Sequence, residues 1–196
     1  WAEHHRRCAR MLEGAGAGQT RVHSTSTEAV LRYTGDGKLR LRGLAFEHRG
    51  DRPATVVSIE AGRIRAEDCR FSGGVSATGR EGAPLLGAGL ALWGDADGGT
   101  VRNSRMERNE AVGVGVAGHA VPVIRDSYLL ANGRSGLVFA DGASGRAEGN
   151  TVRGNGRHGV AVGELASPKL VANTISGNGF NGVAFRRGAT GEVRDN

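Results

Sequence analysis

The sequence is short of the residues that commonly cross-link or rigidify small folds. Its 196 residues include two cysteines, four prolines, five phenylalanines, two tyrosines and two tryptophans. Cys8 and Cys69 do not occupy equivalent positions, which argues against a disulfide framework. No apolar run approaches the roughly 18 residues of a membrane-spanning helix, so we expect no membrane segment. Proteins that bind single-stranded nucleic acid interleave aromatic with basic residues, so the shortage of aromatics argues against a nucleic-acid partner.

Glycine and arginine are abundant instead. The chain has 34 glycines, and its 26 basic residues against 20 acidic ones give a net charge of +6 and a pI near 10.3. The glycines do not follow the Gly-X-Y triplet, so a collagen helix is excluded. The positive charge indicates an anionic polymer or an acidic protein as partner. The alternative is a composition that prefers arginine on solvated surfaces, since only Lys38 and Lys169 are lysines.

A strict period of 23 residues runs through the second half of the chain. It is marked by the asparagines Asn109, Asn132, Asn155 and Asn178. Four residues after each asparagine comes a glycine, in the order Gly113, Gly136, Gly159 and Gly182. Further apolar columns precede each asparagine and follow each glycine at fixed distances, as at Val152, Val160 and Val162. A fixed period with fixed apolar positions is typical of one structural unit stacked on copies of itself.

Each repeat predicts three short strands. The apolar residues after the glycine alternate, as in Val160 and Val162, which is the period of a strand. Three inward-facing strands joined by turns predict one coil of an all-β parallel β-helix, with about seven coils of ~23 residues in the chain. The asparagine column predicts a ladder of side-chain amides running from coil to coil. The glycine column predicts corners that need a positive φ.

The repeats resemble those of a known superfamily. The runs NTVRGNGRHGVAV at 150–162 and NTISGNGFNGVAF at 173–185 are similar to repeats of the pectate-lyase-like superfamily. The resemblance covers residues 39–196 and implies a right-handed parallel β-helix. Because that superfamily includes lyases, hydrolases, epimerases and binding modules, the resemblance implies the fold without naming an activity.

Residues 1–19 precede the repeats. Four of them fall at helical spacing ahead of a glycine, namely Trp1, His5, Cys8 and Leu12. We expect a short N-terminal helix, linker or cap over 1–19 and the β-helix over 20–196. The final coil has no cap after it, so we expect a larger multidomain parent protein or end-to-end association through uncapped coils. No signal peptide is recognisable, which favours the cytoplasm, while the start without Met leaves secretion open.

One insertion interrupts the period. Between Gly74 and Gly89 the coil carries additional residues, 75–86. Such an insertion predicts a loop on one flank of the stack, and loops of repeat proteins often lie beside the binding face. The alternative is a surface insertion that is merely tolerated.

The position before each repeat glycine is the first candidate functional column. It runs Val112, Ser135, His158 and Asn181. In polygalacturonase-type relatives this position carries acidic catalytic residues and a Gly-His-Gly histidine, which Arg157-His158-Gly159 matches in part. No Asp or Glu occupies it here, and glycoside hydrolysis needs two carboxylates. Arg157 and His158 therefore stand as the only catalytic candidates, and we expect His158 to be a turn residue with an exposed ring.

A basic stripe is predicted beside this column. One position earlier the residues are Ala111, Arg134, Arg157 and Phe180. Arginines stacked one coil apart repel each other unless they are solvated or bridged by an anion. The predicted binding stripe comprises Arg134, Ser135, Arg157, His158, Asn181, Arg186 and Arg187. The alternative is an arginine ladder that is merely solvated.

One column carries acidic residues. It runs Gly118, Asp141, Glu164 and Arg187, so Asp141 and Glu164 are a candidate stacked pair of carboxylates. Such a pair suits Ca²⁺, but calcium takes about six or more oxygen ligands and no further ligand occupies a matching position. We therefore expect no metal and no cofactor, with Asp141 and Glu164 as the metal candidates.

These patterns predict a non-catalytic binding or scaffold module. It would present its basic face to an acidic polysaccharide or to a protein partner. The alternative is a lyase or epimerase acting on an acidic polysaccharide, with Arg134, Arg157 and His158 in its groove. A third class is purely structural, a spacer whose length is set by its number of coils. The sequence names neither the ligand nor the oligomeric state.

Overall fold

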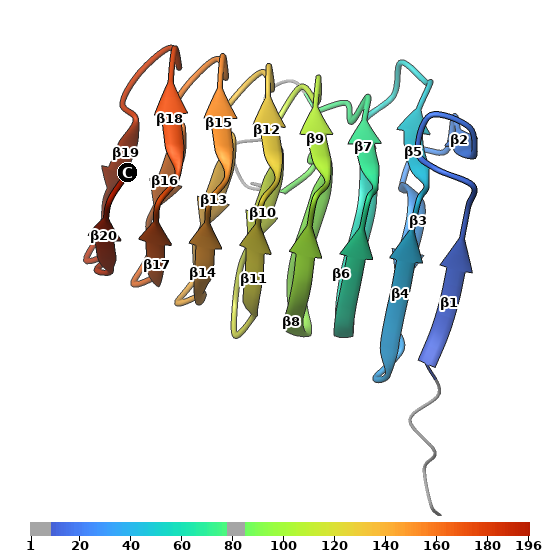
Figure 1. Ribbon diagram of the computed structural model, residues 1–196, viewed down its shortest axis with the longest axis horizontal. Coiled ribbons are helices and arrows are strands. Elements are labelled where there is room, and N and C mark those ends of the chain that lie inside the picture. The colour runs from blue at the N-terminus through green and yellow to red at the C-terminus, as the bar shows by residue number, and fades with distance from the viewer. Residues whose placement is uncertain (1–8, 78–84) are drawn as a thin grey trace, which may run out of the picture.

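The computed structural model describes residues 9–77 and 85–196, and every regular element within them is a β-strand. The strands form a parallel β-solenoid of about seven coils, so the predicted fold is confirmed. Figure 1 shows the coils side by side along the long axis of the molecule, from β1 in blue to β20 in red. The chain therefore presents long, regular faces around an apolar core that runs along the stack.

Each coil contributes strands to three faces of the solenoid. The first face consists of β3 (Ala29–Tyr33), the first halves of β6 (Thr55–Glu67) and β8 (Leu90–Arg102), β10 (Val114–Val116), β13 (Leu137–Phe139), β16 (Val160–Val162) and β19 (Val183–Phe185). The second consists of β1 (Ala9–Glu13), β4 (Lys38–Arg42), the second halves of β6 and β8, β11 (Val121–Arg125), β14 (Ser144–Glu148), β17 (Ser167–Val171) and β20 (Glu192–Arg194). The third consists of β2 (Arg21–Ser24), β5 (Ala45–His48), β7 (Arg70–Ser72), β9 (Arg105–Glu107), β12 (Tyr128–Leu130), β15 (Thr151–Arg153) and β18 (Thr174–Ser176).

The long strands β6 and β8 join the first two faces. They run through both, so these faces form one 13-stranded sheet, while the third face is a separate seven-stranded sheet. Along each strand, successive side chains point alternately inward and outward. The inward columns are the predicted apolar ones, and members such as Met106, Leu129 and Val152 are at most 1% exposed. Outward columns are therefore free to carry function.

Two ladders of polar groups run through the turns. In the first, each asparagine amide donates to Oδ1 of the next at 2.9 Å, in the order Asn109, Asn132, Asn155 and Asn178. This confirms the predicted ladder. In the second, each backbone N–H donates to a side-chain oxygen of the next coil, in the order Cys69, Ser104, Ser127, Asn150, Asn173 and Asn196. The Cys69 thiol is buried, and that burial raises its pKa.

The repeat glycines Gly113, Gly136 and Gly159 are required by close packing between coils, not by the predicted backbone conformation. The expectation of a positive φ is wrong, because Gly113, Gly136 and Gly159 do not have one. A Cβ added to Gly136 would lie 2.9 Å from the carbonyl oxygen of Gly159 and 2.8 Å from Nδ2 of Asn155. The column is therefore glycine because adjacent coils approach closely at this point.

Residues 9–13 form a strand rather than the predicted helix. β1 pairs in parallel with β4, which sets Leu12 opposite Leu41. The pairing satisfies backbone groups of β4 that would otherwise lie at an open edge, and this outweighs a helical spacing of side chains. Trp1, His5 and Cys8 lie outside the described residues. Within the described ranges, no helix is long and apolar enough to cross a membrane.

Candidate functional site

The first face has two hollows, here together called the groove, along a central outward column that consists mainly of small residues, and Leu85 covers that column at Gly115. The column is Arg32, Ser58, Ala91, Gly115, Val138, Ala161 and Ala184. Two cavities lie on this column, one of about 460 Å³ on the side of β3 and one of about 410 Å³ on the side of β19. Both therefore lie on the same face of one sheet, but over different strands.

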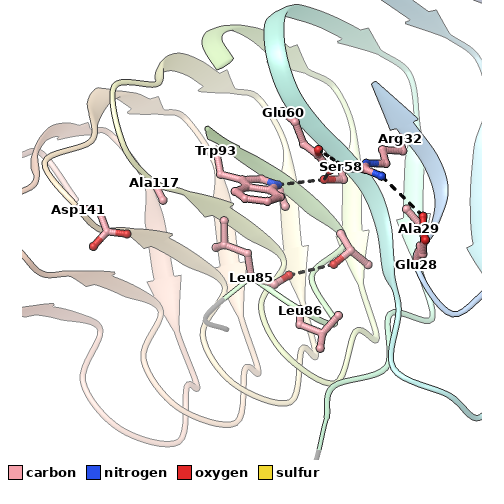
Figure 2. Close-up of a pocket in the computed structure, with 12 residues that line it drawn as sticks. Glu28, Ala29, Arg32, Ser58, Glu60, Leu85, Leu86, Trp93, Ala117 and Asp141 are labelled. Atoms are coloured by element: carbon pink, nitrogen blue, oxygen red, sulfur yellow. Dashed lines mark hydrogen bonds and ion pairs between the residues drawn. The ribbon is translucent and has the colours of Figure 1, made fainter. Parts of the chain in front are cut away.

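The cavity nearer β3, here named the tryptophan pocket, is built around Trp93 (Figure 2). The indole is 44% exposed, although tryptophan is among the largest apolar side chains. Apolar neighbours in the lining are Ala29, Leu85, Leu86, Ala91 and Ala117. Its polar lining consists of Glu28, Arg32, Thr55, Ser58, Glu60 and Asp141. The pocket thus combines one aromatic face with a partly acidic rim.

A chain of hydrogen bonds fixes the indole. Arg32 donates from Nε and Nη2 to the two carboxylate oxygens of Glu60, at 2.8 Å each. Ser58 Oγ donates to Glu60 at 3.1 Å and accepts from Trp93 Nε1 at 3.0 Å. The bond from Arg32 is the main reason that the pKa of Glu60 is lowered. Glu60 is therefore ionised at neutral pH, whereas a general acid needs a raised pKa.

The end of the insertion forms part of this pocket. The carbonyl oxygen of Leu85 accepts from Thr55 Oγ1 at 3.1 Å. The Leu85 side chain lies over Gly115, where an added Cβ would come within 2.0 Å of Leu85 Cδ2. Leu85 and Leu86 at the end of the insertion line the tryptophan pocket, while residues 78–84 lie outside the described part of the chain.

The cavity nearer β19, here named the arginine pocket, gathers most of the predicted stripe. Its lining includes Arg134, Ser135, Arg157, His158, Arg186 and Arg187. Asn181, the remaining member, is exposed and is not part of the lining. Strands β13 and β16, with the turns before them, and the turn after β19 position these side chains. The regular register of the coils therefore brings together residues that are 53 positions apart, from 134 to 187.

The arginines of this pocket differ in their acidic partners. Arg187 pairs with Glu164 at 2.6 Å. By contrast, Arg134, Arg157 and Arg186 form no ion pair with any residue in the described ranges. The Arg157 N–H donates to the Arg134 carbonyl oxygen at 2.8 Å, so the two backbones are stacked one coil apart. Positive charge is therefore concentrated at one end of the groove.

His158 is buried, so the expected exposed ring is wrong. It is 4% exposed, because it packs beneath Phe180, whose ring centroid lies 5.7 Å away, and against Arg186. Arg186 Nη2 lies 3.0 Å from His158 Nε2, and a guanidinium only donates, so Nε2 accepts and Nδ1 carries the proton of the neutral ring. Nδ1 is buried and has no hydrogen-bond partner among the described residues. Burial first, and then Arg186 and Arg157, lower the pKa of His158.

The two metal candidates lie in different pockets. Asp141 lines the tryptophan pocket and Glu164 the arginine pocket. Both have a left-handed backbone, with φ of 52° and 51°, as has Arg187 after them in the column. The carboxylate of Glu164 is engaged by Arg187. Within the described residues, no group of three or more His, Cys, Asp or Glu side chains is placed to hold a metal ion.

A second basic surface lies on the second face. Its cavity is lined by Lys38, Arg63, Arg65, Arg102 and Arg125, among others. Here the arginines have acidic partners: Arg63 contacts Asp97 at 3.1 Å, Glu67 pairs with both Arg65 and Arg102, and Arg125 lies 4.0 Å from Asp126. Because most of this charge is compensated within the fold, the arginine pocket is the stronger candidate for an anion site.

Sequence reasoning missed the tryptophan pocket. The signal was present, since Leu90 and Leu92 are inward and the alternation places Trp93 outward. Trp93 also belongs to an outward row that consists of Glu60, Trp93, Ala117, Ala140, Gly163 and Arg186. The three residues that follow Trp93 in this row are small. The Arg32 and Glu60 pair could not be found in this way, because their coils do not follow the 23-residue period.

Comparison with known families agrees with this architecture. Residues 19–196 match the family described as the right handed beta helix region. No curated protein and no solved structure matches the chain. Inference about function therefore depends on the side chains that line the two cavities.

Proposed function

The chain belongs to the right-handed β-helix family, and from that premise we propose that it is a non-catalytic module whose groove binds an acidic polysaccharide. The observation that carries the proposal is the arginine pocket. Arg134, Arg157 and Arg186 line it without acidic partners in the described residues, together with the buried ring of His158. Guanidinium groups only donate hydrogen bonds. A carboxylate, which only accepts, is their complement.

The shape of the site favours a polymer. Successive coils lie about 4.8 Å apart, so the groove offers equivalent positions at a regular rise. Arg134 and Arg157 are stacked at this rise, and an anion bound between them would relieve their mutual repulsion. The first-face strands between β6 and β16 are paired on both sides, so an acidic peptide cannot bind there by adding a strand. Recognition therefore depends on side chains, which suits a glycan.

The pocket lacks the groups that hydrolysis requires. Glycoside hydrolysis needs two carboxylates, and the arginine pocket is lined by one, Glu164, which pairs with Arg187. One observation favours the second candidate, a lyase or epimerase: His158 is neutral and lies beside two arginines that could hold a uronate. A base needs a free lone pair, however, and Nε2 of His158 already accepts from Arg186. Binding without turnover therefore agrees best with the geometry.

A calorimetric titration with oligogalacturonates of increasing length tests the proposal. We expect saturable binding that weakens with added salt, because the contacts are charge-assisted. Arg157→Ala should reduce the affinity about tenfold or more, since a hydrogen bond to a charged group contributes about 1.5–3 kcal/mol. Arg153→Ala is the matched control, because Arg153 is exposed on the third face.

Three outcomes would contradict the proposal. One is an affinity that Arg157→Ala and Arg153→Ala lower equally, which would indicate nonspecific attraction to a basic protein. Another is turnover: release of unsaturated or epimerised products that Arg157→Ala abolishes would establish the enzyme instead. Absence of binding to any uronate oligomer would also remove the proposal.

A further inference from the structure

The tryptophan pocket and the arginine pocket lie on the same face of the solenoid, but their lining side chains favour different ligands. In the outward row that passes both, Trp93 is followed by Ala117, Ala140, Gly163 and Arg186. Small residues at these positions are sufficient to cover the core, since Ala117 and Ala140 are themselves buried. A half-exposed indole is therefore not required by packing, and exposed large apolar groups in a cavity commonly mark a binding site.

Hydrogen bonds fix the orientation of the Trp93 indole before any ligand binds. Its single donor, Nε1, is already used by Ser58, which is in turn bonded to the Glu60 and Arg32 pair. The ring therefore keeps one orientation and offers only its apolar face and edge (Figure 2). A side chain that is fixed before binding loses little conformational entropy when a ligand arrives.

The rim of the pocket selects against negative charge. Arg32 is neutralised by Glu60 and also approaches Glu28 at 3.8 Å, so it offers little attraction to an anion. Asp141 stands at the other end of the lining (Figure 2). Carboxylates accept hydrogen bonds from hydroxyl groups and repel other carboxylates. The pocket thus suits an uncharged group with an apolar face and a hydroxyl rim, which is the description of a neutral pyranose.

We propose that the tryptophan pocket is a subsite for a neutral pyranose, so that the ligand is a heteropolysaccharide of mixed acidic and neutral sugars. The inference rests on the proposed function, because the acidic sugars occupy the arginine pocket. Trp93 and Arg186 are four coils apart in their row, which corresponds to about 19 Å at 4.8 Å per coil. A ligand that reaches both pockets must therefore be an oligomer, with neutral units at the β3 end and acidic units at the β19 end.

Three probes separate the two pockets: an oligogalacturonate, a neutral cello-oligosaccharide, and a hyaluronan oligosaccharide in which glucuronate alternates with N-acetylglucosamine. Affinities are measured by calorimetry, and occupancy of the tryptophan pocket by quenching of indole fluorescence. We expect the mixed oligomer to bind at least about fivefold more tightly than the all-uronate oligomer of equal length and to quench Trp93. Trp93→Ala should reduce that difference in affinity and leave oligogalacturonate binding unchanged.

Asp141→Asn provides a variant that keeps the fold. Asp141 is exposed and has a φ of 52°, which asparagine tolerates. Removing its charge should reduce the preference for the mixed oligomer, because the all-uronate oligomer is then no longer repelled. The inference is overturned if the all-uronate oligomer binds as tightly as the mixed one, or if Trp93→Ala lowers the affinity for both equally. In those cases an effect of Arg157→Ala on oligogalacturonate still supports the proposed function, whereas no binding of any probe overturns both.

Discussion

The two ends of the groove have the same backbone architecture. They differ in which of their polar side chains lack hydrogen-bond or ion-pair partners. At the β3 end, Trp93, Ser58, Glu60 and Arg32 bond to one another, so the pocket offers an apolar face. At the β19 end, Arg134, Arg157 and Arg186 lack acidic partners in the described residues, and the Nδ1 atom of His158 lacks any hydrogen-bond partner there. The difference teaches that a solenoid can change its ligand chemistry along its length by changing only its outward columns.

The largest effect is expected where the shared scaffold is altered. Gly136→Ala places a Cβ 2.9 Å from the Gly159 carbonyl oxygen, which cannot move without disturbing the next coil. We expect a loss of about 2–3 kcal/mol in the free energy of unfolding, measured by urea denaturation, with both pockets affected together. Gly163→Ala is the control, because an added Cβ there meets nothing within 4 Å. Equal stabilities of the two variants would contradict the close-approach explanation.

An intermediate effect is expected at one end alone. Ser58→Ala removes the link between Trp93 and Glu60, so the indole loses its fixed orientation. The affinity for the mixed oligosaccharide should fall about threefold to tenfold, as expected for the loss of one or two ordinary hydrogen bonds, while oligogalacturonate affinity is unchanged. Ser176→Ala, on the exposed third face, should change neither. A fall in oligogalacturonate affinity would show that the two ends are not separable.

The smallest effect is a shift in protonation at the other end. In the free protein the pKa of His158 lies below its ordinary value of 6.5. A bound anion favours the imidazolium, so binding should raise this pKa, and affinity should rise as the pH falls through the window between the free and bound pKa values. The sign holds while uronates stay ionised, above about pH 4.

NMR titration of the imidazole C–H resonances measures this shift with and without oligogalacturonate. The resonances of exposed His119 are the internal control and should not respond to the ligand. An affinity that falls on acidification over the same window would contradict the placement of the anion beside His158.

The fold could be predicted from the sequence because its determinants are periodic. The asparagine column and the apolar columns act through register, and register is visible as a spacing of 23 residues. The reason for the glycine column was mistaken, since the distance from Gly136 to the next coil is set by stacking rather than by its own φ. Strand β1 was missed because its pairing with β4 is a long-range contact that side-chain spacing does not reveal.

The candidate site could be predicted only in part. Register brought Arg134, Arg157 and Arg186 into one cavity, as their spacing in the repeats predicts. The burial of His158 could not be foreseen, because it depends on how Phe180 and Arg186 of the next coil pack over the ring. Trp93 was visible as an outward residue, but the partners that hold it come from coils of irregular length.

The central claim is that an acidic glycan binds on the first face at its β19 end. The most direct measurement is NMR mapping of backbone amide shifts during a titration with oligogalacturonate. The predicted result is that shifts concentrate at residues 134–138 and 157–163 and at Arg186, while the compensated basic surface around Arg63, Arg65 and Arg102 is unaffected. Shifts centred on that second-face surface, or spread evenly over all basic residues, would contradict it.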